Sequence, residues 1–180
     1  MPYNPDIHKR RSIRIKDYDY SKSGLYFITI CTKDRECIFG MIIDETMDLN
    51  NYGKIVEAEI LETCKIRKEI AIQEYIIMPN HIHLIIEVID VGAYGIRPTT
   101  KNIRNATEQG VSHTPLQSPS KTIGSAIRGI KSAVSRNIGY SVWQRNYHEH
   151  IIRNENSLYK IIEYIRCNPL NWKEDCNYKD

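Results

Sequence analysis

The sequence predicts an α+β protein, and three observations lead to this class. Two runs rich in β-branched residues, 70–77 and 81–89, flank the Met78-Pro79-Asn80 break, which indicates two strands that meet at a turn. Three longer segments repeat apolar residues at helical spacing. A chain of 180 residues is long enough for one domain with a real core, and no internal repeat divides it.

The composition is that of a soluble globular protein, with 41% hydrophobic and 26% charged residues. No apolar run approaches the length of a membrane span, and the first residues lack the apolar stretch of a signal peptide. The five cysteines form no Cys-x-x-Cys pair, which indicates free thiols in a reducing compartment. We therefore expect a cytoplasmic protein without membrane contact.

The first part of the chain is expected to form a basic arm, two strands and a helix. Residues 1–23 are polar and basic and form the arm. Residues 26–32 alternate as a strand, and 37–43 is expected to be its hairpin partner across the polar turn between them. Asn50 or Asn51 can cap the helix that follows.

The second part begins with an abrupt change of composition. Gly, Pro, Thr, Ser and Asn dominate residues 92–120, so we expect a long flexible loop inserted into one domain that spans 1–180. Thr122 is expected to cap a helix with a regular apolar stripe that ends near Ile138. Residues 141–152 are predicted to be irregular or to form a short strand.

Basic residues gather in the N-terminal arm and again between residues 121 and 166. A helix with one buried face and an exposed Ser/Arg/Lys face suits contacts with phosphates, and aromatics among bases can stack on unpaired nucleotides. A solvated basic face, or aromatics that close a core, would give the same pattern. The candidate DNA-binding residues are Arg10, Arg11, Arg14, Arg128, Lys131, Arg136, Arg145 and Arg153.

The strand after the turn carries a His-x-His pair. Side chains alternate along a strand, so His81 and His83 point to one face and the apolar residues between and after them to the other. Two imidazoles about 7 Å apart along a strand can close on one metal ion where the strand twists. Two buried histidines satisfied by hydrogen bonds are the alternative, and a metal site needs a third ligand.

The last helix, which starts at Asn154 or Asn156, offers that ligand and a nucleophile. Tyr164 and Asn168 are four residues apart and project from one face, before Pro169 ends the helix. Two imidazoles and the amide oxygen of Asn168 would hold a divalent cation that polarises a phosphodiester, and the Tyr164 hydroxyl would attack phosphorus. A core aromatic and a helix-terminal asparagine would show the same spacing.

These motifs resemble a known family. His81-Ile82-His83 resembles the His-hydrophobic-His motif of the HUH single-strand endonucleases, and Tyr164-x-x-x-Asn168 is similar to the helix motif of the IS200-like single-tyrosine (Y1) transposases. The likeness is strongest to the REP-associated tyrosine transposases, over roughly residues 24–91 and 121–173. It extends to the flanking segments Tyr26–Thr32, Val142–Arg145, Glu149–Arg153 and Tyr164–Pro169.

The resemblance implies an antiparallel sheet with helices packed on one side, in a ferredoxin-like or RRM-like arrangement. It implies Mg²⁺ or Mn²⁺ as cofactor, single-stranded or hairpin DNA as partner, and a covalent 5′-phosphotyrosine on Tyr164 with His81, His83 and Asn168 as metal ligands. Relatives act as dimers or monomers, so either state is expected here, in the cytoplasm and associated with the nucleoid. The 92–120 loop departs from the family pattern.

Two other functions remain open at this point. A non-catalytic protein with an RRM-like sheet could bind single-stranded nucleic acid by stacking. A metal-dependent nuclease could instead use water, with Tyr164 in a structural role. A covalent adduct between protein and DNA would distinguish the transposase from both. We expect Trp172, after the last helix, to fold back onto the body of the domain.

Overall fold

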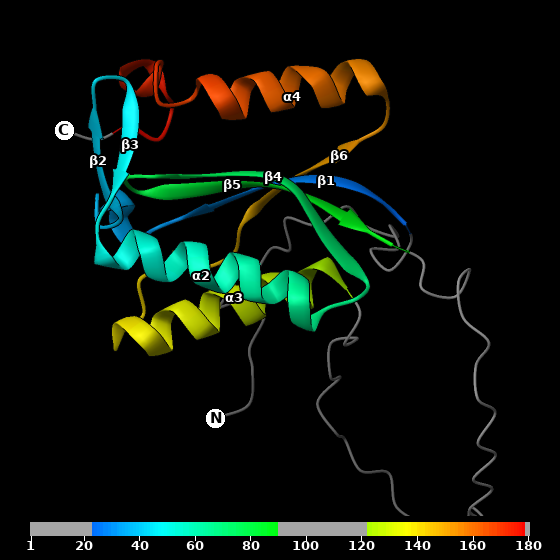
Figure 1. Cartoon of the computed structure of the whole chain (residues 1–180), viewed down its shortest axis with the longest axis horizontal. Coiled ribbons are helices and arrows are strands. Elements are labelled where there is room, and N and C mark those ends of the chain that lie inside the picture. Colours follow the sequence, from blue (N-terminus) through cyan, green and yellow to red (C-terminus); the bar gives the residue numbers. More distant parts are fainter. Residues whose placement is uncertain (1–22, 90–121, 179–180) are drawn as a thin grey trace, which may run out of the picture.

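The computed structural model describes residues 23–89 and 122–178, so the predicted basic arm up to residue 22 and the predicted 92–120 loop lie outside the described residues. Figure 1 shows the arrangement of the elements. In chain order they are β1 (Gly24–Cys31), η1 (Lys33–Arg35), β2 (Gly40–Ile43), β3 (Thr46–Leu49), α2 (Asn51–Ile66), β4 (Ile70–Met78), β5 (His81–Val88), α3 (Ile123–Ile138), β6 (His148–Ile152), α4 (Glu155–Cys167) and η3 (Trp172–Glu174).

The four longer pairing strands form one antiparallel sheet in the order β4-β5-β1-β6. The two-residue turn Pro79-Asn80 joins β4 to β5 and leaves Met78 paired with His81. In β1, Cys31 also pairs with His81, so the end of β1 lies beside the start of β5. The α+β class and the antiparallel sheet predicted from the sequence are confirmed.

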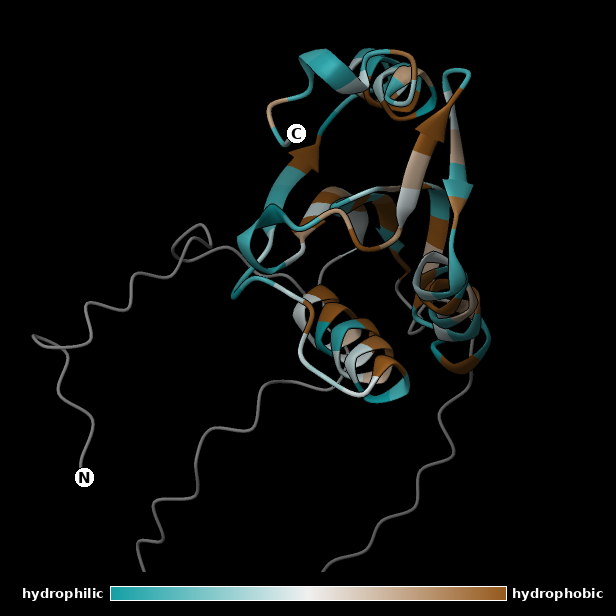
Figure 2. Ribbon diagram, turned by 90° about the vertical axis from the view of Figure 1, so that its left-hand side faces the viewer, coloured by the Kyte–Doolittle hydropathy of each residue, from teal (hydrophilic) through white to brown (hydrophobic). Residues whose placement is uncertain are grey.

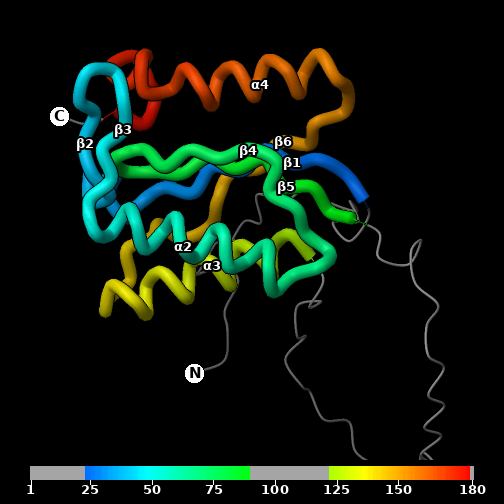
Figure 3. The backbone as a smooth tube through the Cα atoms, viewed as in Figure 1, coloured from blue at the N-terminus to red at the C-terminus, as the bar shows by residue number. Residues whose placement is uncertain are grey.

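The helices divide between the two faces of the sheet. Helices α2 and α3 pack together on one face, as expected, whereas α4 lies on the opposite face (Figures 1 and 3). Figure 2, seen after a quarter turn, shows helical ribbon both above and below the sheet. Only part of the expected one-sided arrangement holds, because α4 has its own apolar stripe and covers the second face of the sheet.

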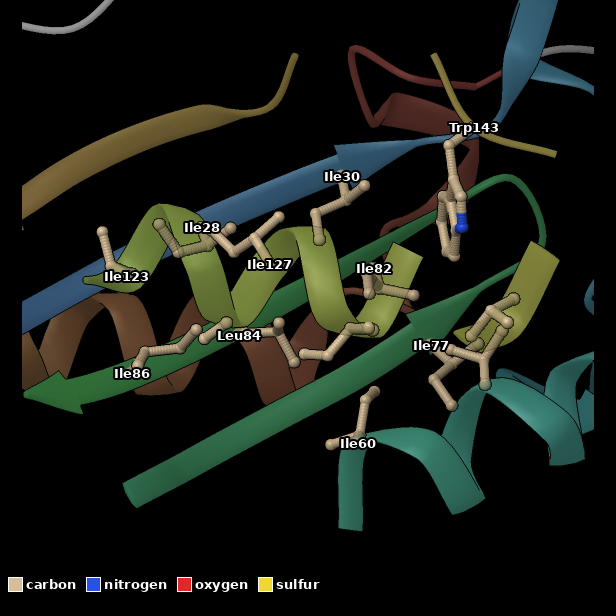
Figure 4. Close-up of a cluster of buried hydrophobic side chains, with 14 of the residues drawn as sticks. Ile28, Ile30, Ile60, Ile77, Ile82, Leu84, Ile86, Ile123, Ile127 and Trp143 are labelled. Carbon is tan, nitrogen blue, oxygen red and sulfur yellow. The ribbon is translucent and has the colours of Figure 1, made fainter. Parts of the chain in front are cut away.

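The main core lies between the sheet and the α2/α3 layer. The face of β5 that was expected to be apolar supplies Ile82, Leu84 and Ile86, all fully buried (Figure 4). Helix α3 contributes the predicted stripe, and Thr122 caps this helix by accepting the backbone N–H of Ser125. A smaller core on the other face joins α4 to the sheet through Ile85, Ile152 and Ile165, together with partly buried neighbours.

The predicted pairing of residues 37–43 with the first strand is wrong. Strand β2 pairs with β3 in a separate two-stranded sheet, because both edges of β1 are already occupied by β5 and β6. Asp44 and Glu45, between β2 and β3, both have positive φ angles (46° and 61°), as a tight type I′ hairpin requires. Gly40 adopts φ 144°, and a Cβ there would lie 2.0 Å from the carbonyl oxygen of Asp48.

The remaining predicted caps and ends agree with the structure. Asn50 caps α2 by accepting the backbone N–H groups of Tyr52 and Gly53, and Asn154 caps α4. Trp172 folds back and is buried, with its ring 5.9 Å from the imidazole of His81. In the described part of the chain, no helix combines the length and the hydropathy that crossing a membrane would take.

Candidate metal and nucleophile site

The imidazoles of His81 and His83 converge on the α4 face of the sheet. Both side chains are buried, and their Nε2 atoms lie 3.0 Å apart. This separation is much shorter than the spacing of their backbones because the rings tilt toward each other, with ring centroids 4.5 Å apart. The predicted common facing of the two histidines is therefore present, and both nitrogens point at one position in space.

The turn residue Asn80 fixes the tautomer of His81. The fully buried Asn80 amide donates two hydrogen bonds, to the carbonyls of Arg35 and Asn177, so its Oδ1 must be the atom 2.9 Å from His81 Nδ1. A carbonyl oxygen only accepts, so His81 carries its proton on Nδ1 and presents a lone pair at Nε2. The sequence pattern predicts Asn80 only as a turn residue and does not indicate this role.

Thr29 holds the second imidazole. Its hydroxyl lies 2.9 Å from His83 Nδ1, and the two residues are directly paired across β1 and β5. The Phe27 ring stacks on His83 at 5.1 Å and meets Tyr164 edge-on. A hydrogen bond at Nδ1 leaves Nε2 to face the site, which is how metal-binding histidines are usually oriented.

Both histidines are uncharged near neutral pH. Burial lowers the pKa of His81 to about 4, despite the opposing charge of Asp175. Burial, followed by the proximity of His81, lowers the pKa of His83 to about 3. Neutral imidazoles are the form that binds metal ions, so the site is prepared for a cation without having to lose a proton.

Helix α4 brings Tyr164 over the two imidazoles. The Tyr164 hydroxyl lies 3.3 Å from His83 Nε2 and donates a 2.9 Å hydrogen bond to Asp175 Oδ2. The side chain is 41% exposed, so the hydroxyl sits between the buried histidines and solvent. Burial, the hydrogen bond to Asp175 and the negative charge of Asp175 raise the pKa of the Tyr164 phenol.

Asp175 is the site residue that the sequence analysis missed. It lies in the tail after α4, and its carboxylate accepts hydrogen bonds from Tyr164, from the Asn168 amide and from the backbone N–H of Asn177. Burial alone would raise the pKa of this carboxyl, but these donors and His81 together lower it, so Asp175 is ionised. The sequence did offer one signal for this residue. The tail was expected to fold back onto the domain at Trp172, and Asp175 is an acid only three residues later.

The donor set fits a divalent ion. His81, His83 and Asp175 each offer a ligand atom, and these atoms lie within 4.8 Å of one another. Two nitrogens bound to one ion at about 2.1 Å and at a right angle lie roughly 3 Å apart, as the two Nε2 atoms do. Asn168 Oδ1 is buried and has no hydrogen-bond partner in the described part of the chain, so a fourth possible ligand atom lacks a partner that an ion would provide.

Five of the predicted DNA-binding residues lie in the described part of the chain. Arg128, Lys131 and Arg145 line a groove of about 880 Å³ between α3 and residues 141–147. Lys131 is partly committed there, because its ammonium donates to the carbonyls of Gln144 and Asn146, and burial lowers its pKa. Arg136 and Arg153 are exposed. The remaining three candidates, Arg10, Arg11 and Arg14, lie outside the described residues.

Comparison with known proteins identifies relatives of this chain. It is 42% identical over 184 residues to an uncharacterized protein of Haemophilus influenzae, covering 99% of this chain and 98% of that protein. It is 26% identical over 153 residues to a second Haemophilus influenzae protein, provisionally named a REP-associated tyrosine transposase, covering 84% of this chain and 73% of that protein. No family model matches the sequence.

A solved structure shares the fold. The structure of a REP-associated tyrosine transposase bound to a REP hairpin superposes with a TM-score of 0.59 at 18% identity, covering 89% of this chain and 74% of that chain. The chain therefore has the fold of that transposase structure. The chain belongs to the family of the first Haemophilus protein, and its predicted resemblance to the REP-associated tyrosine transposases is confirmed.

Proposed function

We propose that the protein is a metal-dependent single-strand DNA endonuclease and strand transferase that acts through a covalent 5′-phosphotyrosine. The observation that carries the proposal is the position of the Tyr164 hydroxyl, 3.3 Å from the nitrogen of a paired-histidine site. A nucleophile beside a cluster of ligand atoms is the arrangement that phosphoryl transfer to a side chain requires. The relatives are in agreement with this reaction class.

In the proposed reaction, the Tyr164 oxygen forms a bond to the phosphorus of a phosphodiester. The bond from phosphorus to the 3′ oxygen of the neighbouring nucleotide breaks, and that oxygen leaves as a hydroxyl after taking up a proton. The tyrosyl proton passes first to an acceptor, and Asp175 already accepts it in a hydrogen bond. Because the phosphotyrosine keeps the ester linkage, a 3′ hydroxyl can attack it and rejoin DNA without a nucleotide cofactor.

His81 and His83 are the proposed metal ligands, with oxygen from Asn168, as predicted from the sequence, and from Asp175, which the structure adds. A divalent ion such as Mg²⁺ or Mn²⁺ supplies positive charge that neutralises the phosphate oxygens as negative charge develops on them. Asn80 and Thr29 orient the two imidazoles through their Nδ1 atoms. Asp175 and Asn168 also hold each other through the Asn168 amide.

The substrate we propose is single-stranded DNA that carries a hairpin, held partly by phosphate contacts in the α3 groove. Arg128 and Arg145 supply charge to this groove, and the described residues that line it include no acid. A groove lined by arginines and hydroxyl side chains suits a phosphate backbone. The solved relative was bound to a REP hairpin, which supports the choice of a hairpin substrate.

Cleavage of a hairpin-containing single-stranded oligonucleotide with Mn²⁺, followed by denaturing electrophoresis, tests this function. We expect a protein–DNA adduct with the wild-type chain, no adduct with Tyr164→Phe, and wild-type behaviour with the matched control Tyr159→Phe. Tyr159 is 67% exposed and lies on the opposite flank of α4. Undiminished cleavage by Tyr164→Phe would reject the proposed nucleophile.

The same experiment distinguishes the two other functions. Cleavage that requires Tyr164 but never yields an adduct would indicate a nuclease that uses water. Binding without cleavage in any divalent ion would indicate a non-catalytic DNA-binding protein. The double variant His81→Ala/His83→Ala should lose metal-dependent cleavage while the far-ultraviolet circular dichroism spectrum stays that of a folded chain.

A further inference from the structure

The β1–β6 side of the sheet carries aromatic side chains that the proposed reaction does not use. His148 and His150 lie on the edge strand β6, and both are exposed. They form a second His-x-His pair, but the metal-ligand cluster found among the described residues does not include them. Phe27, on the neighbouring strand β1, is partly exposed. We refer to Phe27, His148 and His150 as the edge platform.

The strand register places the edge platform on the same face as the metal and nucleophile site. Thr29 pairs with His83 on one side and with His148 on the other, and Phe27 pairs with His150. Directly opposed residues of an antiparallel pair share a face. His148 therefore lies one strand beyond the threonine that orients His83, and His150 lies beside the phenylalanine that stacks on His83.

The orientation of α4 opens the site toward this platform. Arg166, about 200° around the helix from Tyr164, forms a 2.8 Å ion pair with Glu74 on β4. The Arg166 flank of α4 thus faces β4, and the Tyr164 flank lies over His83 on β5 and Phe27 on β1. The edge-on contact between the Tyr164 and Phe27 rings agrees with this orientation. A strand that reaches the Tyr164 hydroxyl from the β6 side of the sheet passes over the edge platform.

A hollow of about 350 Å³ continues the platform at the outer edge of β6. His150, Arg153, Asn154 and Ser157 line it, so it combines an aromatic ring with a guanidinium, an amide and a hydroxyl. Glu149 also lines the hollow, but it pairs with the core residue Ile28 and its side chain belongs to the other face. Both Glu149 carboxylate oxygens are buried, so they are not contact atoms for a ligand at the surface.

From this geometry we infer that the edge platform binds unpaired DNA bases by stacking and guides the strand to Tyr164. Aromatic and imidazole rings on an open sheet face bind single strands in this way, and stacking accepts any base. Arg153 then lies where it can contact a phosphate of the same strand. The inference rests on the proposed function, because it assigns the path by which the substrate of that reaction reaches the nucleophile.

Binding of a short unpaired strand of thymidine and 2-aminopurine nucleotides, measured without divalent ions, tests the inference. The fluorescence of 2-aminopurine falls when the base stacks, so one titration gives both the Kd and the stacking. The variant His148→Ala/His150→Ala should bind at least about tenfold more weakly and lose the quenching. His148→Phe/His150→Phe should bind within about threefold of wild type, since phenylalanine stacks but neither carries charge nor binds metal. The control Tyr159→Ala should be unchanged.

Several outcomes would overturn the platform. One is wild-type affinity in His148→Ala/His150→Ala. Another is a loss of affinity in His148→Phe/His150→Phe as large as in the alanine pair, which would indicate imidazole charge or metal binding. The third is an equally large loss of affinity in Tyr159→Ala. If the alanine pair binds normally while the wild type forms the Tyr164 adduct, the platform fails and the proposed function stands. If the wild type stacks bases but never forms an adduct, the proposed function fails and the platform stands.

Discussion

At the scale of single residues, the site depends on hydrogen bonds that fix each ring. Thr29→Val should leave His83 without its Nδ1 partner while preserving side-chain shape. Loss of a hydrogen-bond partner behind a metal ligand typically weakens metal binding about 10-fold to 100-fold, so we expect a Mn²⁺ affinity reduced by this factor in isothermal titration calorimetry. Thr46→Val, an exposed threonine in β3, is the control. Unchanged affinity in Thr29→Val would show that Thr29 does not orient a ligand.

The carboxylate of Asp175 and the amide oxygen of Asn168 are the two candidates for the third metal ligand. Asp175→Asn removes the carboxylate charge, and Asn168→Ala removes the amide oxygen that has no hydrogen-bond partner among the described residues. We expect each variant to lower Mn²⁺ affinity by at least about tenfold, because carboxylate and amide oxygens both suit hard divalent ions. Glu174→Gln, an exposed acid one residue before Asp175, should have no effect. If only Asn168→Ala loses affinity, Asp175 positions Tyr164 but does not bind the ion.

The sequence was sufficient to predict that His81 and His83 share one face of the sheet, because strand alternation needs only local pattern. Their partners required information that the pattern does not contain. Thr29 meets His83 through the register of β1 against β5, which residues far apart in the chain determine. Asp175 lies in an irregular tail, where no periodicity indicates which side chain turns inward. For Tyr164 and Asn168, helical spacing was sufficient to predict that both project from one face of the last helix.

At the scale of elements, the sequence predicted the existence of strands better than their pairing. Residues 40–43 do form a strand, but its partner is β3, joined by the Asp44-Glu45 turn, rather than β1. The dipeptide lacks the Asn or Gly that usually marks such a turn, so the hairpin signal was weak. The caps at Asn50, Thr122 and Asn154 were predicted well because a side chain that accepts a nearby backbone N–H is a local device.

The groove along α3 gives a prediction at the same scale. Arg128→Gln should reduce the slope of log affinity against log salt for hairpin DNA by about 1, because one phosphate contact is lost. Lys131→Met should also lower the free energy of unfolding in urea, since the Gln144 and Asn146 carbonyls lose their donor. Arg166→Gln, whose guanidinium pairs with Glu74, is the control. An unchanged slope in Arg128→Gln would exclude this groove as a phosphate site.

At the scale of the whole molecule, the two faces of the sheet have different roles. The face under α2 and α3 is apolar and holds most of the core. The face under α4 holds both histidines, the tyrosine and, toward its open edge, the exposed rings of β6. In the proposed reaction, the sheet therefore serves as a rigid support on one side and as the reacting surface on the other, which is how precisely spaced catalytic groups are best held.

The central claim is that Tyr164 becomes covalently bound to the 5′ phosphate of cleaved DNA. The most direct measurement is mass analysis of peptides from the protein after reaction with a hairpin oligonucleotide and Mn²⁺. We predict one modified peptide, with a phosphonucleotide on Tyr164 joined through its 5′ phosphate, and a free 3′ hydroxyl on the released strand. A phosphonucleotide on another tyrosine such as Tyr147, or cleaved DNA with no modified peptide, would contradict the account.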